Sequence, residues 1–257
     1  MILSLSRRLA LLACTALTLA IAAPAQAATD RTLIVASSAT YAPFAFETND
    51  KQVVGFDIDI INAIAEKRGL KLRIVNTPFT SIFASLNNGD VDLVISGVTI
   101  TEKRKQSFDF SAPYFEARQL IAVPENSTLQ SLQDVKGRKV AVVSASTADD
   151  VVSKLLGKAS SDIRRFESTP LIISELSSGG VDVAIGDNGV IAYRVSQTTG
   201  LKTVDDPDFP QEYFGIVFRQ GDDALREEID AGLAALRADG TYDALYQKWF
   251  KQAYKAH

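Results

Sequence analysis

The chain has almost none of the residues that form disulfides or histidine metal sites. It contains 1 cysteine, Cys14, and 1 histidine, His257, among 257 residues. A single cysteine cannot form a disulfide within the chain, and a single histidine excludes histidine triads and histidine metal clusters. We therefore expect no catalytic centre and no metal site built on these residue types, and we assign the chain no metal and no cofactor.

Basic residues are also too few to suggest a nucleic-acid partner. The sequence has 27 Lys and Arg against 31 Asp and Glu, a formal net charge of −4. It shows no stripe of basic residues, so we expect no binding to nucleic acid.

Long apolar runs are absent beyond the first 27 residues, which resemble an export signal. Arg7-Arg8 precede an apolar region at 9–22, and Ala25-Gln26-Ala27 is a small-x-small cleavage site. The apolar region is too short for a membrane span, and no later run approaches about 18 residues. The alternative is lipoprotein processing at Cys14, which would leave too short an apolar region in front of it. We favour a cleaved signal peptide at 1–27, and hence a location in the periplasm.

The chain nearly repeats itself. Segment 87–97, Asn-Asn-Gly-Asp-Val-Asp-Leu-Val-Ile-Ser-Gly, returns at 177–187 as Ser-Ser-Gly-Gly-Val-Asp-Val-Ala-Ile-Gly-Asp. Each copy reads as a helix that ends at a glycine C-cap, followed by a short buried strand. Similar strands and helices precede both copies, which predicts an α/β fold with two lobes, each a mostly parallel sheet flanked by helices. Open α/β sheets bind ligands beyond the carboxyl ends of their strands, so Ser96-Gly97 and Gly186-Asp187 should face one cleft.

Apolar periodicity and turn residues give the order of the elements. We predict strands at 33–36, 72–75, 91–95, 139–143, 163–166, 181–185 and 213–218, and helices at 57–68, 81–88, 148–156, 171–178, 189–199, 222–238 and 242–252. No linker rich in Pro, Gly or Ser divides the chain, so the second lobe reads as an insertion joined by two crossover hinge strands. We expect lobe 1 at 28–117 plus 216–257 and lobe 2 at 118–215.

Side chains suited to a small ligand lie in the loops at the strand ends. Arg104 stands one turn into a helix that Thr101 can cap, and its planar guanidinium suits a carboxylate. The alternative for Arg104 is a surface ion pair with Glu102 or Asp109, and spacing alone favours that alternative. In the second half, Ser144-Ala145-Ser146-Thr147 opens a helix, whose N-terminus favours anions, although such residues also serve simply as caps.

Three further residues stand at comparable positions. Asp187 ends a predicted strand, where its carboxylate could hold an ammonium group. Tyr41 and Phe79 each follow a strand and could supply aromatic walls with a cation-π face, or could belong to the core.

Four segments together resemble a known family. They are 41–44 (Tyr-Ala-Pro-Phe), 55–59 (Gly-Phe-Asp-Ile-Asp), 96–104, and 108–114 (Phe-Asp-Phe-Ser-Ala-Pro-Tyr). They resemble solute-binding protein family 3, the polar amino-acid-binding proteins of bacterial ABC importers, and the likeness runs from about Thr32 to Phe250.

The resemblance implies a role for each candidate residue. Arg104 would clamp the α-carboxylate of an amino acid, helped by Thr99 and by the helix start at Thr147. Asp187 would hold the α-ammonium group. The remaining implied contacts are a further acceptor from Ser96 or Gly97 and two walls around the ligand side chain from Tyr41 and Phe79.

Two positions depart from the family pattern. Members that bind cationic amino acids often carry an acid where this chain has Ser38, which suggests a neutral polar side chain or an apolar one for the ligand. Glu47 or Asp149 could supply a charge from elsewhere. Ala145 replaces a frequent glycine in the anion-binding loop, which bears on how closely the backbone approaches the carboxylate.

We thus expect a monomeric, periplasmic substrate-binding component of an ABC importer. It would bind a free L-amino acid, most simply a polar one, by hinged closure, and deliver it to an inner-membrane ABC permease. The alternative is a periplasmic enzyme of the dehydratase type on the same fold, but no loop clearly aims a second carboxylate or a lysine at a bound substrate. A receptor sensor domain would need a membrane span in the mature chain.

Overall fold

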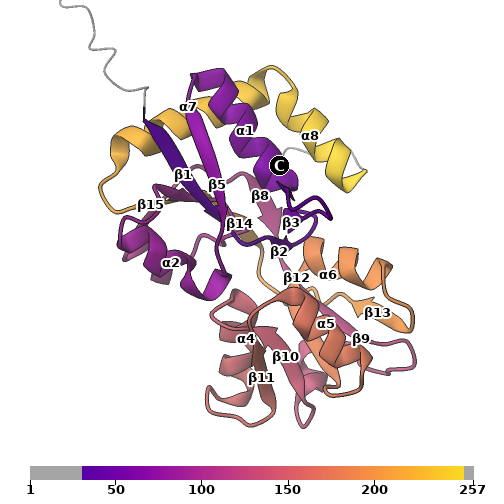
Figure 1. Ribbon diagram of the computed structural model, residues 1–257. Helices are drawn as coiled ribbons and strands as arrows, with labels where there is room; N and C mark the ends of the chain where they lie inside the picture. The colour runs from indigo at the N-terminus through magenta and orange to yellow at the C-terminus, as the bar shows by residue number, and fades with distance from the viewer. Residues whose placement is uncertain (1–30, 252–257) are drawn as a thin grey trace, which may run out of the picture.

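Two α/β lobes form the molecule, one above the other in Figure 1. The computed structural model describes residues 31–251, so the predicted signal peptide lies outside the described residues. Each lobe is built around a five-stranded sheet, and the two-lobed fold predicted from the internal repeat is confirmed. Among the described residues, none of the helices combines the length and the apolarity that crossing a bilayer requires.

The first sheet has the strand order β5-β1-β6-β15-β7. Its strands are β1 (Thr32–Ser37), β5 (Lys71–Asn76), β6 (Leu93–Val94), β7 (Phe108–Phe110) and β15 (Val217–Arg219). β1 pairs in parallel with β5 and β6, and β15 runs antiparallel between β6 and β7.

The second sheet repeats this plan in the order β11-β10-β12-β9-β13. Its strands are β9 (Gln119–Pro124), β10 (Val140–Val143), β11 (Ile163–Phe166), β12 (Val183–Asp187) and β13 (Leu201–Val204). β10 pairs in parallel with β11 and β12, and β9 runs antiparallel between β12 and β13. In both lobes the single reversed strand is the one that follows a crossover from the other lobe.

The two crossovers pair with each other. β8 (Phe115–Ala117) leads into β9, β14 (Glu212–Phe214) leads into β15, and the two run antiparallel as a separate two-stranded sheet. The predicted strand at 213–218 is therefore wrong as a single element, because it breaks at Gly215-Ile216 between the crossover and the first sheet. The predicted lobe boundaries at 117/118 and 215/216 stay a prediction.

Helices cover both faces of each sheet, as strand alternation requires. Val35 and Leu93 face a core with α1 (Phe56–Arg68), α7 (Asp223–Ala238) and α8 (Thr241–Phe250), while Ala36 and Val94 face α2 (Phe79–Asn87). In the second sheet, one face packs on α4 (Thr147–Leu156) and the 3-10 helix η1 (Leu132–Val135), and the other on α5 (Thr169–Ser177) and α6 (Asn188–Ser196).

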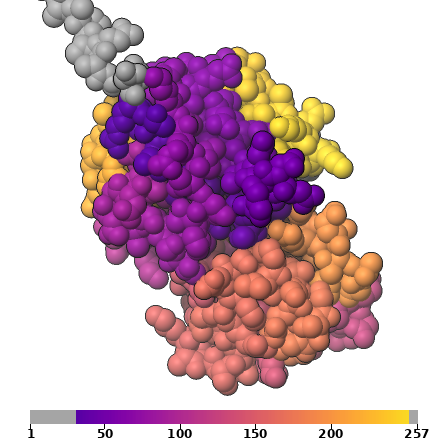
Figure 2. Space-filling view, viewed as in Figure 1, coloured from indigo at the N-terminus to yellow at the C-terminus, as the bar shows by residue number. Residues whose placement is uncertain are grey.

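The remaining elements are short. β2 (Thr40–Tyr41), β3 (Ala45–Glu47) and β4 (Val53–Val54) form a small antiparallel sheet beside α1, and α3 (Glu102–Lys105) is one helical turn. Figure 2 shows the second lobe, in salmon and orange, abutting the first lobe, in indigo and magenta. Residues at the carboxyl ends of parallel strands from both sheets, among them Ser96 and Asp187, line one space between the lobes.

Candidate ligand-binding site

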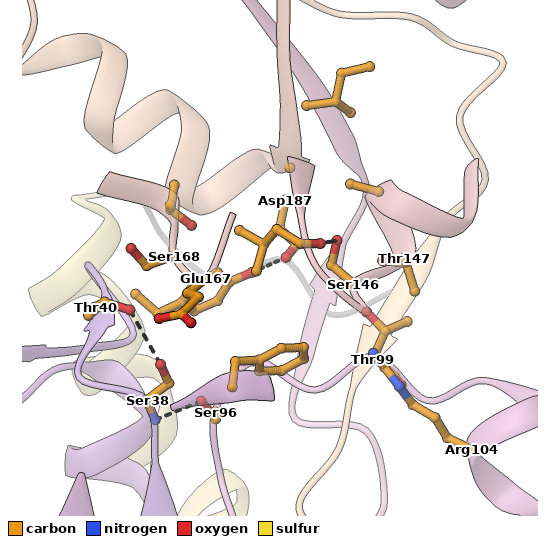
Figure 3. Close-up of a pocket in the computed structure, with 18 residues that line it drawn as sticks. Ser38, Thr40, Ser96, Thr99, Arg104, Ser146, Thr147, Glu167, Ser168 and Asp187 are labelled. Carbon is orange, nitrogen blue, oxygen red and sulfur yellow. Dashed lines mark hydrogen bonds between the residues drawn. The ribbon is translucent and has the colours of Figure 1, made fainter. Parts of the chain in front are cut away.

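A pocket lies between the lobes, and all of the predicted site residues line it. It encloses about 570 Å³ of space that no atom fills, part of it open solvent. Figure 3 shows the lining side chains. The predicted residues that line it are Ser38, Tyr41, Phe79, Ser96, Gly97, Thr99, Arg104, Thr147 and Asp187.

Arg104 crosses from the first lobe to the second. Thr101 caps the helical turn by accepting a hydrogen bond from the Arg104 backbone N–H at 3.1 Å. The guanidinium donates to the Thr99 carbonyl at 2.8 Å and to the Ala145 carbonyl of the second lobe at 3.2 Å. It also lies over the Phe79 ring, 5.9 Å from the centroid. Burial lowers the pKa of Arg104, and the acids Asp150 and Glu212 oppose that shift.

The suggested surface pairing of Arg104 is not what the structure contains. Glu102 pairs with Lys105 at 2.9 Å, and Asp109 accepts a hydrogen bond from the Gly221 backbone N–H at 2.7 Å. Within residues 31–251, the guanidinium of Arg104 donates to backbone carbonyls at the pocket and to no carboxylate.

Asp187 presents a carboxylate to the pocket from the end of β12. It accepts hydrogen bonds from the Tyr41 hydroxyl of the first lobe and from the Gln119 amide, the latter at 2.9 Å. Burial, followed by repulsion from Glu212, raises the pKa of Asp187 well above its ordinary range. A cation placed beside Asp187 would lower this pKa again, because an opposite charge favours the ionised carboxylate.

A buried hydrogen-bond cluster behind the pocket joins both lobes to the crossover strand β14. One oxygen of Glu212 accepts from the Thr99 hydroxyl and the Thr147 hydroxyl, each at 2.9 Å, and from the Gln119 amide at 3.2 Å. The Gln119 amide also donates to Thr147 at 3.0 Å. Glu212 therefore fixes one hydroxyl from each lobe against a strand that connects the lobes.

Sequence reasoning missed Gln119 and Glu212. Both lie within strands, and both are buried, Gln119 completely and Glu212 to 7% exposure. The signal in the sequence is a polar residue within or next to a predicted strand. Such a residue is expected to be buried, and a buried polar group needs a hydrogen-bond partner. The signal does not show which partners those are.

Gly97 holds the first lobe's loop in a conformation that only glycine accommodates easily. Its φ is +55°, and a Cβ there would lie 2.4 Å from Cε1 of Tyr41. Its backbone N–H donates to Asp57 at 2.8 Å, and the Tyr114 hydroxyl donates to the same carboxyl group at 2.9 Å. Asp57 is completely buried, and burial raises its pKa to about 7, although both hydrogen bonds act to lower it.

The second lobe's loop opens α4 with a strained alanine. Ala145 has φ +62°, in the left-handed region that favours glycine. The glycine frequent at this position in the family would adopt that φ without strain. Ser146, not Thr147, caps α4 by accepting from the Asp149 backbone N–H at 3.2 Å. The Thr147 hydroxyl is thereby left to bond Glu212.

Neither acid proposed as a substitute for the missing charge at Ser38 reaches the pocket. Glu47 pairs with Lys51 at 2.9 Å, and Asp149 pairs with Arg165 at 2.9 Å. The Ser38 hydroxyl lies 3.3 Å from that of Thr40. A different acid, Glu167 of the second lobe, lines the pocket, and sequence reasoning did not identify it.

Comparison with known proteins places this architecture in a family. Residues 33–252 match the model of the bacterial extracellular solute-binding proteins, family 3. The chain belongs to this family. It is 45% identical over 219 residues to the probable histidine-binding protein of Neisseria gonorrhoeae, covering 84% of this chain and 82% of that protein. It is 31% identical over 252 residues to the L-arginine-binding protein of Pseudomonas aeruginosa, covering 95% and 96%.

Solved structures also resemble this family 3 protein. The arginine-, lysine-, histidine-binding protein ArtJ of Geobacillus stearothermophilus matches with a TM-score of 0.85 and 38% identity, covering 88% of this chain and 97% of that one. An ancestral amino acid-binding protein, a precursor of cyclohexadienyl dehydratase, matches with a TM-score of 0.79 and 37% identity, covering 85% and 95%. The binding proteins head the comparisons, so a binding role is supported over the dehydratase alternative.

Proposed function

We propose that this family 3 protein is the substrate-binding component of an ABC importer and holds one free L-amino acid between its lobes. The observation that carries the proposal is that Arg104 from one lobe and Asp187 from the other line a single pocket. A zwitterion has one carboxylate and one ammonium group, and these two side chains are the charges that complement it.

The remaining pocket residues suit the same ligand. Thr99 and Thr147 line the same pocket as Arg104, and their backbone N–H groups would orient the α-carboxylate while their hydroxyls stay bonded to Glu212. Tyr41 and Phe79 line the pocket from the first lobe, and their rings would enclose the ligand side chain.

Closure would follow from the division of the site between the lobes. A ligand that touches both lobes stabilises the closed arrangement relative to the open one, and this differential contact drives the movement. We place the hinge in β8 and β14, with lobe 1 at 28–117 plus 216–257 and lobe 2 at 118–215. The working location is the periplasm, the active form is a monomer, and an inner-membrane ABC permease receives the ligand.

A ligand panel tests this function. Protein unfolded and refolded to remove endogenous ligand is heated with each amino acid, and hits are measured by calorimetry. A true ligand at about 100 times its dissociation constant should stabilise the protein by about 2.7 kcal/mol. If no amino acid binds, the proposal fails, and steady conversion of a substrate to product would favour the dehydratase alternative.

A further inference from the structure

The polar groups of the pocket divide into two ends. In Figure 3, Thr99, Arg104, Ser146 and Thr147 are drawn on one side, Ser38, Thr40, Glu167 and Ser168 on the other, and Asp187 lies between them. Arg104 and Asp187 would account for the carboxylate and the ammonium group that every amino acid has. The second side is therefore where a ligand side chain would extend.

That second side contains oxygen atoms and a negative charge. Ser38 and Thr40 contribute hydroxyl groups that lie 3.3 Å apart. Ser168 precedes α5, and its side chain makes no capping hydrogen bond to that helix, so its hydroxyl is not committed to the usual role of a residue at this position. Glu167 adds an exposed carboxylate.

The charges around the pocket do not balance with a neutral ligand. Arg104, Asp187 and Glu167 line the pocket, buried Glu212 lies directly behind it, and Arg194 donates to the Thr40 carbonyl at 3.4 Å, so three acids face two bases. A zwitterion with an uncharged side chain adds no net charge and leaves this acid excess in place. A positively charged side chain reduces the excess and meets a carboxylate at the correct end of the pocket.

We propose that the ligand carries a cationic side chain, a guanidinium or ammonium group, and that Glu167 is the residue that selects it. This inference rests on the proposed amino-acid-binding function. A guanidinium has five N–H donors and no acceptor. The carboxylate of Glu167 and the hydroxyls of Ser38, Thr40 and Ser168 offer such a group acceptors. The acid that is missing at Ser38 is thus supplied from the opposite lobe.

The test compares L-arginine with L-citrulline, which has nearly the same shape but no charge on its side chain. Calorimetry on refolded protein should give about two- to fivefold tighter binding of arginine, a size typical of one exposed charge pair. Glu167→Gln should bring the ratio close to one by weakening arginine binding, with citrulline unaffected. Glu125→Gln, an exposed acid of the same lobe outside the pocket, is the matched control and should change neither affinity.

The outcomes separate this inference from the function beneath it. If citrulline or L-glutamine binds as tightly as arginine, or if the Glu167→Gln ratio equals that of the unmodified protein, the inference is overturned while amino-acid binding stands. If L-histidine alone binds, its affinity should rise between about pH 8 and about pH 5.5, as the imidazole gains its proton, by more in the unmodified protein than in Glu167→Gln. Equal profiles overturn the inference, and binding of no amino acid overturns the proposed function itself.

Discussion

At the scale of single residues, Arg104 offers the sharpest test of the site. Arg104→Ala should weaken amino-acid binding by more than tenfold, because it removes a charge-assisted contact worth about 1.5–3 kcal/mol. Arg104→Lys should also bind poorly, since an ammonium group cannot reproduce the planar fork. Calorimetry measures the affinity, and thermal unfolding of the ligand-free variants should change little.

Lys105→Ala is the matched control for Arg104. Lys105 lies in the same helical turn, and its pairing with Glu102 is exposed, so its removal should alter affinity very little. Unchanged affinity in Arg104→Ala, or an equal loss in both variants, would contradict a carboxylate-binding role for Arg104.

Because Asp57 is buried, we expect the free energy of unfolding to depend on pH. Burial raises its pKa to about 7 from the usual 3.8, so the folded protein holds a proton that the unfolded chain has lost between about pH 4 and pH 7. The contribution of Asp57 to the free energy of unfolding is therefore largest at the acidic end of that window. It falls as the pH rises, by up to about 1.4 kcal/mol per pH unit. Asp57→Asn should flatten the slope, because its amide can serve both Gly97 and Tyr114 without a charge.

Denaturant unfolding at a series of pH values measures that slope. Asp187, whose pKa is also raised, contributes equally to the slopes of the unmodified protein and of Asp57→Asn. The difference between the two slopes therefore isolates the contribution of Asp57. Identical slopes in the two proteins would show that Asp57 is not the titrating group.

At the scale of elements, α6 presses on the first lobe at a position where opposing effects can be separated. A Cβ on Gly189 would lie 2.9 Å from the Phe44 ring. Phe44 cannot move easily, because it packs against Phe56, Phe115, Phe214 and Phe250. Gly189→Ala should therefore disfavour contact between the lobes, at a cost of about 1–3 kcal/mol, while alanine favours the helix itself.

Ligand affinity and ligand-free stability should then move independently. We expect Gly189→Ala to lower ligand affinity about tenfold by calorimetry, the equivalent of about 1.4 kcal/mol, and to leave the melting temperature of the ligand-free protein equal or slightly higher. A fall in both would instead indicate that Phe44 and Gly189 stabilise the fold of each lobe.

Elements set by local sequence were predictable, and elements set by distant partners were not. The helix at 57–68 follows from its apolar spacing and from Gly69, which ends α1 with φ +66°. The break between β14 and β15 does not follow from the sequence, because each half pairs with a strand about 100 residues away, β8 or β7.

The site shows the same division. The strand ends located Ser96, Gly97 and Asp187, because the geometry of an α/β sheet fixes where its carboxyl ends lie. Glu167 precedes a helix cap, and Glu212 lies within a strand, so each reads locally as an ordinary polar residue. Their place at the pocket depends on how the two lobes face each other, which no local pattern encodes.

At the scale of the whole molecule, the structure has its lobes in direct contact. Tyr41 donates to Asp187, and Arg104 donates to the Ala145 carbonyl across the pocket. Both contacts use side chains that the proposed ligand would also engage. A bound amino acid would thus add its own contacts to this direct interface, and the ligand would decide the balance between open and closed arrangements.

Small-angle scattering tests this movement. The radius of gyration of refolded, ligand-free protein should exceed that of protein saturated with a ligand from the panel, and the saturated curve should match the arrangement in Figure 1. Asp187→Asn should shift the balance towards the open form at equal ligand concentration, because one end of a desolvated zwitterion loses its opposite charge. A radius that stays constant on saturation would rule out a hinged trap, and the permease would then have to recognise the loaded protein by something other than the positions of its two lobes.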